Sequence, residues 1–335
     1  MNPQLNRHPV MADFFWLTKY TNPYGTEVRR FDRKLRQLGF VKDDYDNYIL
    51  DIGQSNTVFA AHLDTADNKM KKVRRVVVGD MISTDGTTLL GADDRAGVAI
   101  LLHLIRNQIP GRYVLFVGEE SGRIGSSLVA ASLDSKWYDY HRMICWDRYG
   151  TTSIITHQMG VETASSRFTQ DLADLYRAAS EMLPSHLNKI DLSDDAGGTY
   201  TDSYSFIDII PECTNISVGY EMQHTNKEYQ DGRFLISMAE ASLIIPWESL
   251  PTEADPFNRN NLYPTNRYVR TTLDEGWWDD DNVVPFHKAP MRTADDIIDA
   301  AVGGWLDTRD VEQFVFQYPE EASWLLDTLL REGRL

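Results

Sequence analysis

Short apolar runs alternate with longer amphipathic stretches over residues 1–250 of the chain. The short runs are rich in β-branched and aromatic residues, which favour strands. Strands that alternate with helical stretches are typical of an α/β fold with parallel strands and crossover helices. The runs predict strands at 57–61, 112–117, 142–146, 152–156 and 215–219.

The longer stretches have apolar residues at helical spacing. In the stretch 25–39, Val28, Phe31 and Leu35 fall on one face, and Gly39 lies where a helix would end. We therefore expect a mixed, mostly parallel central sheet flanked by helices. The predicted helices span 25–39, 95–107, 165–183 and 231–245.

The composition changes beyond about residue 250, where turn-rich and acidic segments follow one another. We expect a catalytic domain at 1–250 and an irregular acidic linker at 251–290. A possible capping box and a stripe of leucines near the end of the chain predict a small helical C-terminal module at 291–335.

The formal net charge of −17 disfavours nucleic acid as a partner, because a phosphate backbone is bound through clustered Lys and Arg. Only two cysteines occur, Cys145 and Cys213, both in apolar surroundings, so no disulfide framework is indicated. The chain has no apolar run long enough for a membrane span and no signal-peptide pattern at its N-terminus. We expect a cytoplasmic protein.

Five motifs carry the candidate chemistry, each with a His or carboxylate at or just after a predicted strand. In open α/β sheets the site lies beyond the carboxyl ends of the strands, so the five motifs can converge there. In chain order they are AAHLDTA (60–66), LLGADDRAG (89–97), FVGEESGRIGS (116–126), CWDRYG (145–150) and MQHTNKEY (222–229).

The first two motifs place carboxylates beside potential ligands. His62 and Asp64 are two residues apart in an extended segment, so Asp64 can accept the second ring N–H of His62. In GADDRAG, Asp93 is the candidate ligand, and Asp94 is expected to cap the following helix. Taken alone, HLD is also typical of an exposed histidine followed by a turn.

Glu119 and Glu120 follow an apolar strand, where adjacent carboxylates would repel each other without a nearby cation. Since adjacent side chains point in different directions, we expect Glu120 to bind a metal and Glu119 to act as the general base. A surface Glu-Glu pair is the alternative. With Asp147 at a strand end and His224 in a late loop, the nitrogen and oxygen donors suit zinc, manganese or cobalt.

As an ordered set, the motifs resemble those of the co-catalytic zinc exopeptidases, which include leucyl aminopeptidases, peptidase T and the carboxypeptidase G type. The resemblance covers about residues 15–245, and the segment 83–97 is particularly similar to peptidase T. It implies a zinc exopeptidase (phosphorylase/hydrolase-like) fold with two divalent metal ions, Zn²⁺ being expected and Mn²⁺ or Co²⁺ possible. It also implies Glu119 as base, Asp64 as support for His62, and the ligands His62, Asp93 (bridging), Glu120, Asp147 and His224.

The spacing of the motifs selects one branch of these enzymes. Other branches insert a dimerisation or lid domain between His62 and Asp93 or between Asp147 and His224, and both intervals are too short here. The single-domain leucyl aminopeptidase branch fits best, which leaves the oligomeric state open. The segment 201–212 resembles that branch's S-D-H-x-x-F segment, but Ser203 replaces its histidine, so that residue's role does not carry over.

We expect a metal-dependent hydrolase that cleaves a terminal amide bond of a peptide or amino-acid conjugate, as an aminopeptidase. An N-acyl amino-acid deacylase or carboxypeptidase is an alternative, and so is a glutaminyl-cyclase-like transferase with one zinc. A binding or assembly protein on a retained peptidase fold is the non-enzymatic alternative. Arg148 could meet a substrate carboxylate, although a structural salt bridge is the simpler interpretation.

Overall fold

The computed structural model describes residues 7–132 and 134–256. The predicted helical module at 291–335 and most of the predicted linker lie outside these residues. All five predicted strands and all four predicted helices are present, with ends that differ by a few residues.

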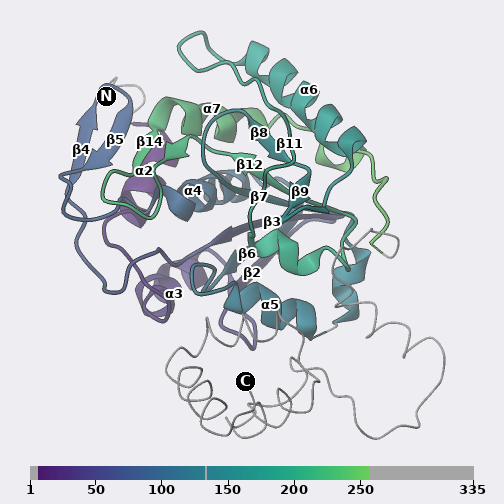
Figure 1. Ribbon diagram of the computed structural model, residues 1–335, viewed down its shortest axis with the longest axis horizontal. Coiled ribbons are helices and arrows are strands. Elements are labelled where there is room, and N and C mark those ends of the chain that lie inside the picture. The colour runs from purple at the N-terminus through teal and green to yellow at the C-terminus, as the bar shows by residue number, and fades with distance from the viewer. Residues whose placement is uncertain (1–6, 133, 257–335) are drawn as a thin grey trace, which may run out of the picture. The chain divides into compact units, whose positions relative to one another are not determined.

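The centre of the fold is an eight-stranded sheet in the order β1-β2-β6-β3-β7-β12-β8-β11 (Figure 1). Its inner strands β6, β3, β7 and β12 are parallel to one another, whereas β2 joins β6 and β8 joins β12 in antiparallel fashion. The predicted mixed, mostly parallel sheet is therefore confirmed. The strands span Val41–Lys42 (β1), Tyr48–Ile52 (β2), Thr57–His62 (β3), Gly111–Phe116 (β6), Arg142–Arg148 (β7), Ser153–Ile155 (β8), Ser193–Asp195 (β11) and Glu212–Ser217 (β12).

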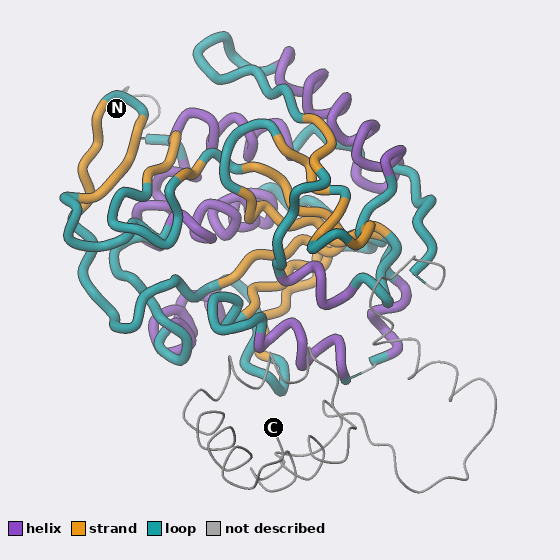
Figure 2. The backbone as a smooth tube through the Cα atoms, viewed as in Figure 1, coloured by secondary structure: helices purple, strands orange, loops and turns teal. Residues whose placement is uncertain are grey.

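Helices cover both faces of this sheet (Figure 2). The helices α2, α4, α6 and α7 share one apolar core with one set of strand residues, whereas α5 and the short helix η2 pack on the other side. Alternation within β3 explains this, because Phe59 and Ala61 enter the first core and Val58 and Ala60 the second. The helices span Pro9–Leu17 (α2), Glu27–Gln37 (α3), Ala92–Arg106 (α4), Ile124–Ala131 (α5), Ser166–Met182 (α6) and Gly232–Ser242 (α7).

A smaller four-stranded sheet, in the order β13-β14-β5-β4, lies beside the central one and was not predicted. It carries the loop with His224, which follows β13. The remaining elements are β4 (Arg75–Val78), β5 (Met81–Thr84), β9 (His157–Gln158), β10 (Val161–Glu162), β13 (Tyr220–Glu221), β14 (Tyr229–Asp231), η1 (Ser135–Asp139), η2 (Asp202–Phe206) and η3 (Trp247–Ser249).

Among the described residues, no helix combines the length and the apolar character that a membrane span requires.

Candidate metal centre

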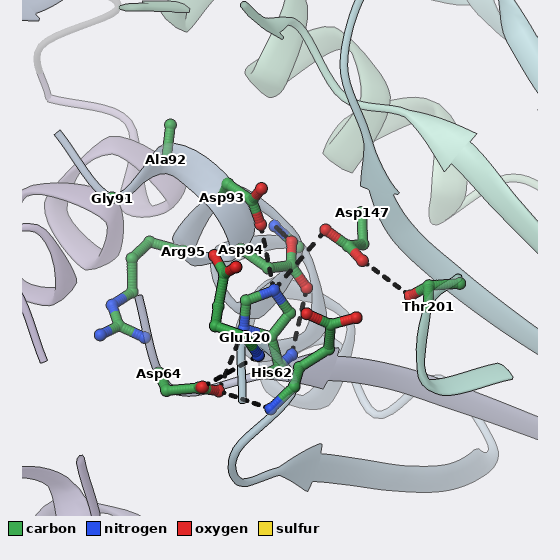
Figure 3. A network of polar contacts seen from close by, with 12 residues as sticks. His62, Asp64, Gly91, Ala92, Asp93, Asp94, Arg95, Glu120, Asp147 and Thr201 are labelled. Atoms are coloured by element: carbon green, nitrogen blue, oxygen red, sulfur yellow. Dashed lines mark hydrogen bonds and ion pairs between the residues drawn. The ribbon is translucent and has the colours of Figure 1, made fainter. Parts of the chain in front are cut away.

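The six predicted site residues and Asp64 lie together at the carboxyl end of the parallel strands, and Figure 3 shows the core of this cluster. His62 is the last residue of β3, Asp147 lies near the end of β7, and Glu119 and Glu120 follow β6. The expectation that each motif places its His or carboxylate at or just after a strand is wrong for Asp93, which is the second residue of α4. His224 lies in the loop that follows β13, a strand of the smaller sheet.

Asp93 stands between two groups of donor atoms. Its Oδ1 lies 3.0 Å from His62 Nε2, which is 3.7 Å from Asp147 Oδ1. Its Oδ2 lies 3.0 Å from His224 Nε2, which is 3.2 Å from Glu120 Oε2. Each oxygen of the Asp93 carboxylate therefore faces one imidazole, and each imidazole lies beside one further carboxylate.

Asp94 is also close to the cluster, since donors of His62, Asp94 and Asp147 lie within 4.8 Å of one another, as do those of His62, Asp93 and Glu120. However, the oxygens of Asp94 accept hydrogen bonds from the backbone N–H groups of His62 (3.2 Å) and Gly97 (3.0 Å). The second of these is a helix-capping bond, as predicted for Asp94. Asp93 is therefore the better placed ligand of the two.

Asp64 connects three parts of the site. Its two oxygens accept hydrogen bonds from the backbone N–H groups of Glu119 (3.0 Å) and Glu120 (3.1 Å). Its Oδ1 also lies 3.4 Å from His62 Nδ1, the ring nitrogen that faces away from Asp93. A carboxylate in this position fixes the orientation of the imidazole ring.

Residues that sequence reasoning missed hold Asp147 in place. Thr201 Oγ1 donates to Asp147 Oδ2 at 2.7 Å, and the Tyr220 hydroxyl donates to Oδ1 at 3.1 Å. The amide of Asn215, on the neighbouring strand β12, accepts from the backbone N–H of Asp147 and donates to its carbonyl, both at 2.7 Å. These partners are distant in sequence, and no local pattern marks them.

Glu228 holds the loop that carries Asp93. Its buried carboxylate accepts four backbone hydrogen bonds, from Leu90 (2.8 Å), Gly91 (2.7 Å), Ala92 (2.7 Å) and Asp93 (3.1 Å). Glu228 lies in the same motif as His224. One short segment therefore supplies a candidate ligand and fixes the backbone of another.

The site concentrates charge in a buried place. Burial raises the pKa of Glu119 well above its usual value, and Asp147 adds to this while His62 opposes it. Burial also raises the pKa of Glu120, with a further contribution from Asp93. Hydrogen bonds to Asp93 and Glu120 raise the pKa of His224 to about 11. Carboxylates held this close favour a compensating cation.

The residues present fit divalent metal ions. Two imidazoles and three carboxylates are the donor types that zinc, manganese and cobalt accept. In addition, Glu120 Oε1 is buried and has no hydrogen-bond partner in the described part of the chain. A buried carboxylate oxygen without a partner is costly, and a bound cation would satisfy it.

Three other sequence expectations have clear outcomes. Arg148 forms an ion pair with Asp195 at 3.2 Å, which matches the simpler interpretation of that residue. Ser203 is buried and accepts a hydrogen bond from Gln158 Nε2 at 3.0 Å, so it serves the packing of its segment. Cys145 and Cys213 are free and buried, as their apolar surroundings indicated.

No family model matches the chain. In sequence, a stretch of 95 residues is 38% identical to the uncharacterized protein YqjE of Bacillus subtilis. That stretch covers 26% of this chain and 25% of the relative.

Solved peptidase structures match a larger part of the chain. Aminopeptidase PepT from Bacillus cereus is 18% identical with a TM-score of 0.56, and the match covers 72% of this chain and 98% of that one. A tripeptidase from Staphylococcus aureus is 17% identical with a TM-score of 0.54, and the match covers 71% of this chain and 97% of that one. An aminopeptidase from the archaeon Desulfurococcus kamchatkensis is 15% identical with a TM-score of 0.53, and the match covers 74% of this chain and 95% of that one. The described part of the chain therefore has the fold of these peptidases, which confirms the predicted resemblance at the level of the fold.

Proposed function

We propose that this protein is a metal-dependent hydrolase that removes a terminal residue from short peptides, as an aminopeptidase. The arrangement around Asp93 carries this proposal, because its two oxygens face two separate donor pairs beside Glu119. The fold supports it, since the similar structures are an aminopeptidase, a tripeptidase and a further aminopeptidase.

The proposed cofactor is a pair of divalent metal ions, Zn²⁺ in the first instance. His62 and Asp147 would hold one ion and His224 and Glu120 the other, with Asp93 shared between them. When bound, the pair would polarise the scissile carbonyl and lower the pKa of a water toward about 7. The two free cysteines are consistent with a cytoplasmic location, where thiols stay reduced.

Glu119 supplies the acid–base chemistry in this proposal. Its carboxylate takes a proton from the attacking water as the oxygen adds to the scissile carbonyl carbon. Glu119 then gives this proton to the leaving nitrogen as the C–N bond breaks, so the products are a carboxylic acid and an amine. Asp64 keeps Glu119 beside the candidate ligands, because it binds the backbone N–H groups of Glu119 and Glu120.

The substitution Glu119→Gln tests this role. It preserves shape but removes the proton acceptor, so we expect kcat to fall about 100- to 10,000-fold while bound metal stays the same. The measurement is hydrolysis of a dipeptide panel by zinc-loaded protein, with metal content determined in parallel. Glu162→Gln, at an exposed position on β10, is the matched control and should leave kcat unchanged. Full activity in Glu119→Gln would rule out Glu119 as the base.

Metal stoichiometry separates this proposal from the transferase alternative. Two ions per chain agree with the two donor groups around Asp93. One ion per chain, with cyclisation of an N-terminal glutamine and no peptide hydrolysis, would favour the single-zinc transferase.

A further inference from the structure

Arg123 belongs to the same turn as the proposed base. The backbone N–H of Arg123 donates to the carbonyl of Glu119 at 2.8 Å, and the turn leads directly into α5. Arg123 has a positive φ of 58°, a backbone conformation that costs energy for a residue with a side chain. The turn therefore holds the backbone of Arg123 against that of Glu119 at a cost in backbone energy.

Two tyrosines and a serine orient the guanidinium of Arg123. Its central carbon lies 4.7 Å from the ring centroid of Tyr200 and 5.2 Å from that of Tyr204. The two rings meet edge to face at 5.0 Å, and Arg123 Nη1 donates to Ser205 Oγ at 3.0 Å. Stacking on aromatic rings leaves the planar edge of a guanidinium free to donate hydrogen bonds.

The position of Tyr200 connects this cluster to the other side of the site. Tyr200 precedes Thr201, whose hydroxyl donates to Asp147. Arg123 thus lies between the segment of the proposed base and a segment that contacts a candidate metal ligand. Tyr200 is 43% exposed, whereas Arg123, Tyr204 and Ser205 are partly buried, so the cluster reaches solvent at Tyr200.

Arg123 has no acidic partner within 4.0 Å in the described ranges 7–132 and 134–256, although the whole chain carries a net charge of −17. Arg112 is a useful comparison, because it is also stacked on two rings, those of Trp137 and Tyr140. Unlike Arg123, Arg112 forms a two-pronged ion pair with Asp51. An oriented arginine with free donors is suited to a carboxylate that comes from outside the chain.

We propose that Arg123 binds the C-terminal carboxylate of the substrate, so that the preferred substrates are di- and tripeptides with a free C-terminus. This inference rests on the proposed peptidase function and adds the substrate class to it. The surrounding carboxylates favour the free amine of such a peptide, while Arg123 favours its other end. Arg148, which is already paired with Asp195, does not compete for this role.

The wild-type protein provides the first test. Zinc-loaded enzyme is assayed with dialanine, trialanine and the C-terminal amide of each. We expect kcat/KM to be about 10- to 100-fold higher for the free acids, mainly through KM, because the amides lose a charge-assisted hydrogen bond. Equal kcat/KM values for acids and amides would overturn the inference while leaving the peptidase proposal intact. If none of the four peptides is cleaved, the peptidase proposal fails, and the inference fails with it.

Variants then assign the preference to Arg123. Arg123→Gln should lower kcat/KM for the free acids to the level of the amides and leave the amides unaffected, whereas Arg123→Lys should retain part of the preference. Arg112→Gln removes an arginine stacked in the same way at the opposite end of β6, and should change neither value. A parallel loss for acids and amides in Arg123→Gln, with metal content unchanged, would show that Arg123 only supports the fold.

Discussion

Asp64 shows how one buried carboxylate can organise a site without binding metal itself. It is fully buried, and its oxygens contact the ring of His62 and the backbone of Glu119 and Glu120. The sequence predicted that Asp64 lies beside His62, because side chains two residues apart in an extended segment point to the same side. The contact with the turn after β6 was not predictable, because it depends on β6 pairing next to β3.

The substitution Asp64→Asn should weaken metal binding without emptying the site. An amide places an N–H₂ group against one of two backbone N–H donors, so the loop with Glu120 and the ring of His62 lose their orientation. Loss of such an outer contact costs about 10- to 100-fold in metal affinity. Competition titration with a zinc chelator measures this value. Asp67→Asn, which removes the carboxylate that pairs with the exposed Lys71 ammonium, is the control, and equal affinities for both variants would contradict the prediction.

Glu27 provides a prediction about pH. Both of its carboxylate oxygens are buried without hydrogen-bond partners in the described part of the chain, and burial raises its pKa to about 7. A carboxyl group whose pKa is higher in the folded state binds a proton preferentially there. The folded state therefore loses stability as the pH rises from about 4.5 to about 7, since folding then requires a buried charge or a bound proton.

The neutral variant Glu27→Gln should remove this dependence. At pH 8 we expect it to be more stable than the wild type by about 1–3 kcal/mol, and at pH 4.5 to be nearly equal. Urea unfolding at both pH values measures the difference. A variant that is less stable than the wild type at pH 8 would show that the charged form of Glu27 is stabilised by its surroundings, among them Arg95.

At the scale of elements, periodicity predicted the long segments and missed the short ones. The helix α2 was missed although Val10, Phe14 and Leu17 are buried at helical spacing. Strands of two to four residues are too short to show a clear period. The smaller sheet consists of such strands, β13, β14, β5 and β4, so it escaped prediction, and with it the reason why His224 reaches Asp93.

Glu228, in the segment after β13, holds the loop that leads into α4. Its four backbone hydrogen bonds fix the loop 90–93, so Glu228→Gln would set an N–H₂ group against amide donors. Buried donors left without partners cost about 1–3 kcal/mol each, and we expect a loss of about 2–4 kcal/mol in the free energy of unfolding. Denaturant unfolding of metal-free protein measures this loss.

The matched control for Glu228→Gln is Glu181→Gln, which removes an exposed carboxylate paired with Lys189. Surface substitutions of this kind usually change stability by less than about 0.5 kcal/mol. If the two variants unfold at the same denaturant concentration, Glu228 does not hold the loop as the hydrogen bonds indicate.

At the scale of the molecule, the order of motifs was sufficient to predict the fold class and to collect the candidate ligands. The order of motifs did not predict the order of strands in the sheet. The strand β3 lies between β6 and β7, although it precedes both in the chain. The partners of Asp147 show the same limit. Thr201 and Tyr220 lie 54 and 73 positions away in the chain and meet it only when the sheet is formed.

Because acidic side chains accumulate at one end of the sheet, the proposed metal binding should stabilise the folded domain. Ions that bind only the folded state stabilise it by about 2.7 kcal/mol per site at a concentration one hundred times Kd. Two filled sites would therefore contribute about 5 kcal/mol, which corresponds to a rise of about 10 °C or more in Tm for a domain of this size. Calorimetry of the whole chain, first with chelator and then with excess zinc, measures the change.

The substitution Asp93→Asn distinguishes a shared ligand from two independent sites. Because each Asp93 oxygen faces one donor pair, the variant should lose most of the zinc-dependent rise in Tm. Asp147→Asn removes a carboxylate from one pair only, so about half of the rise should remain. An equal loss in the two variants would indicate that a single ion is bound and that the donors of His224 and Glu120 serve another purpose.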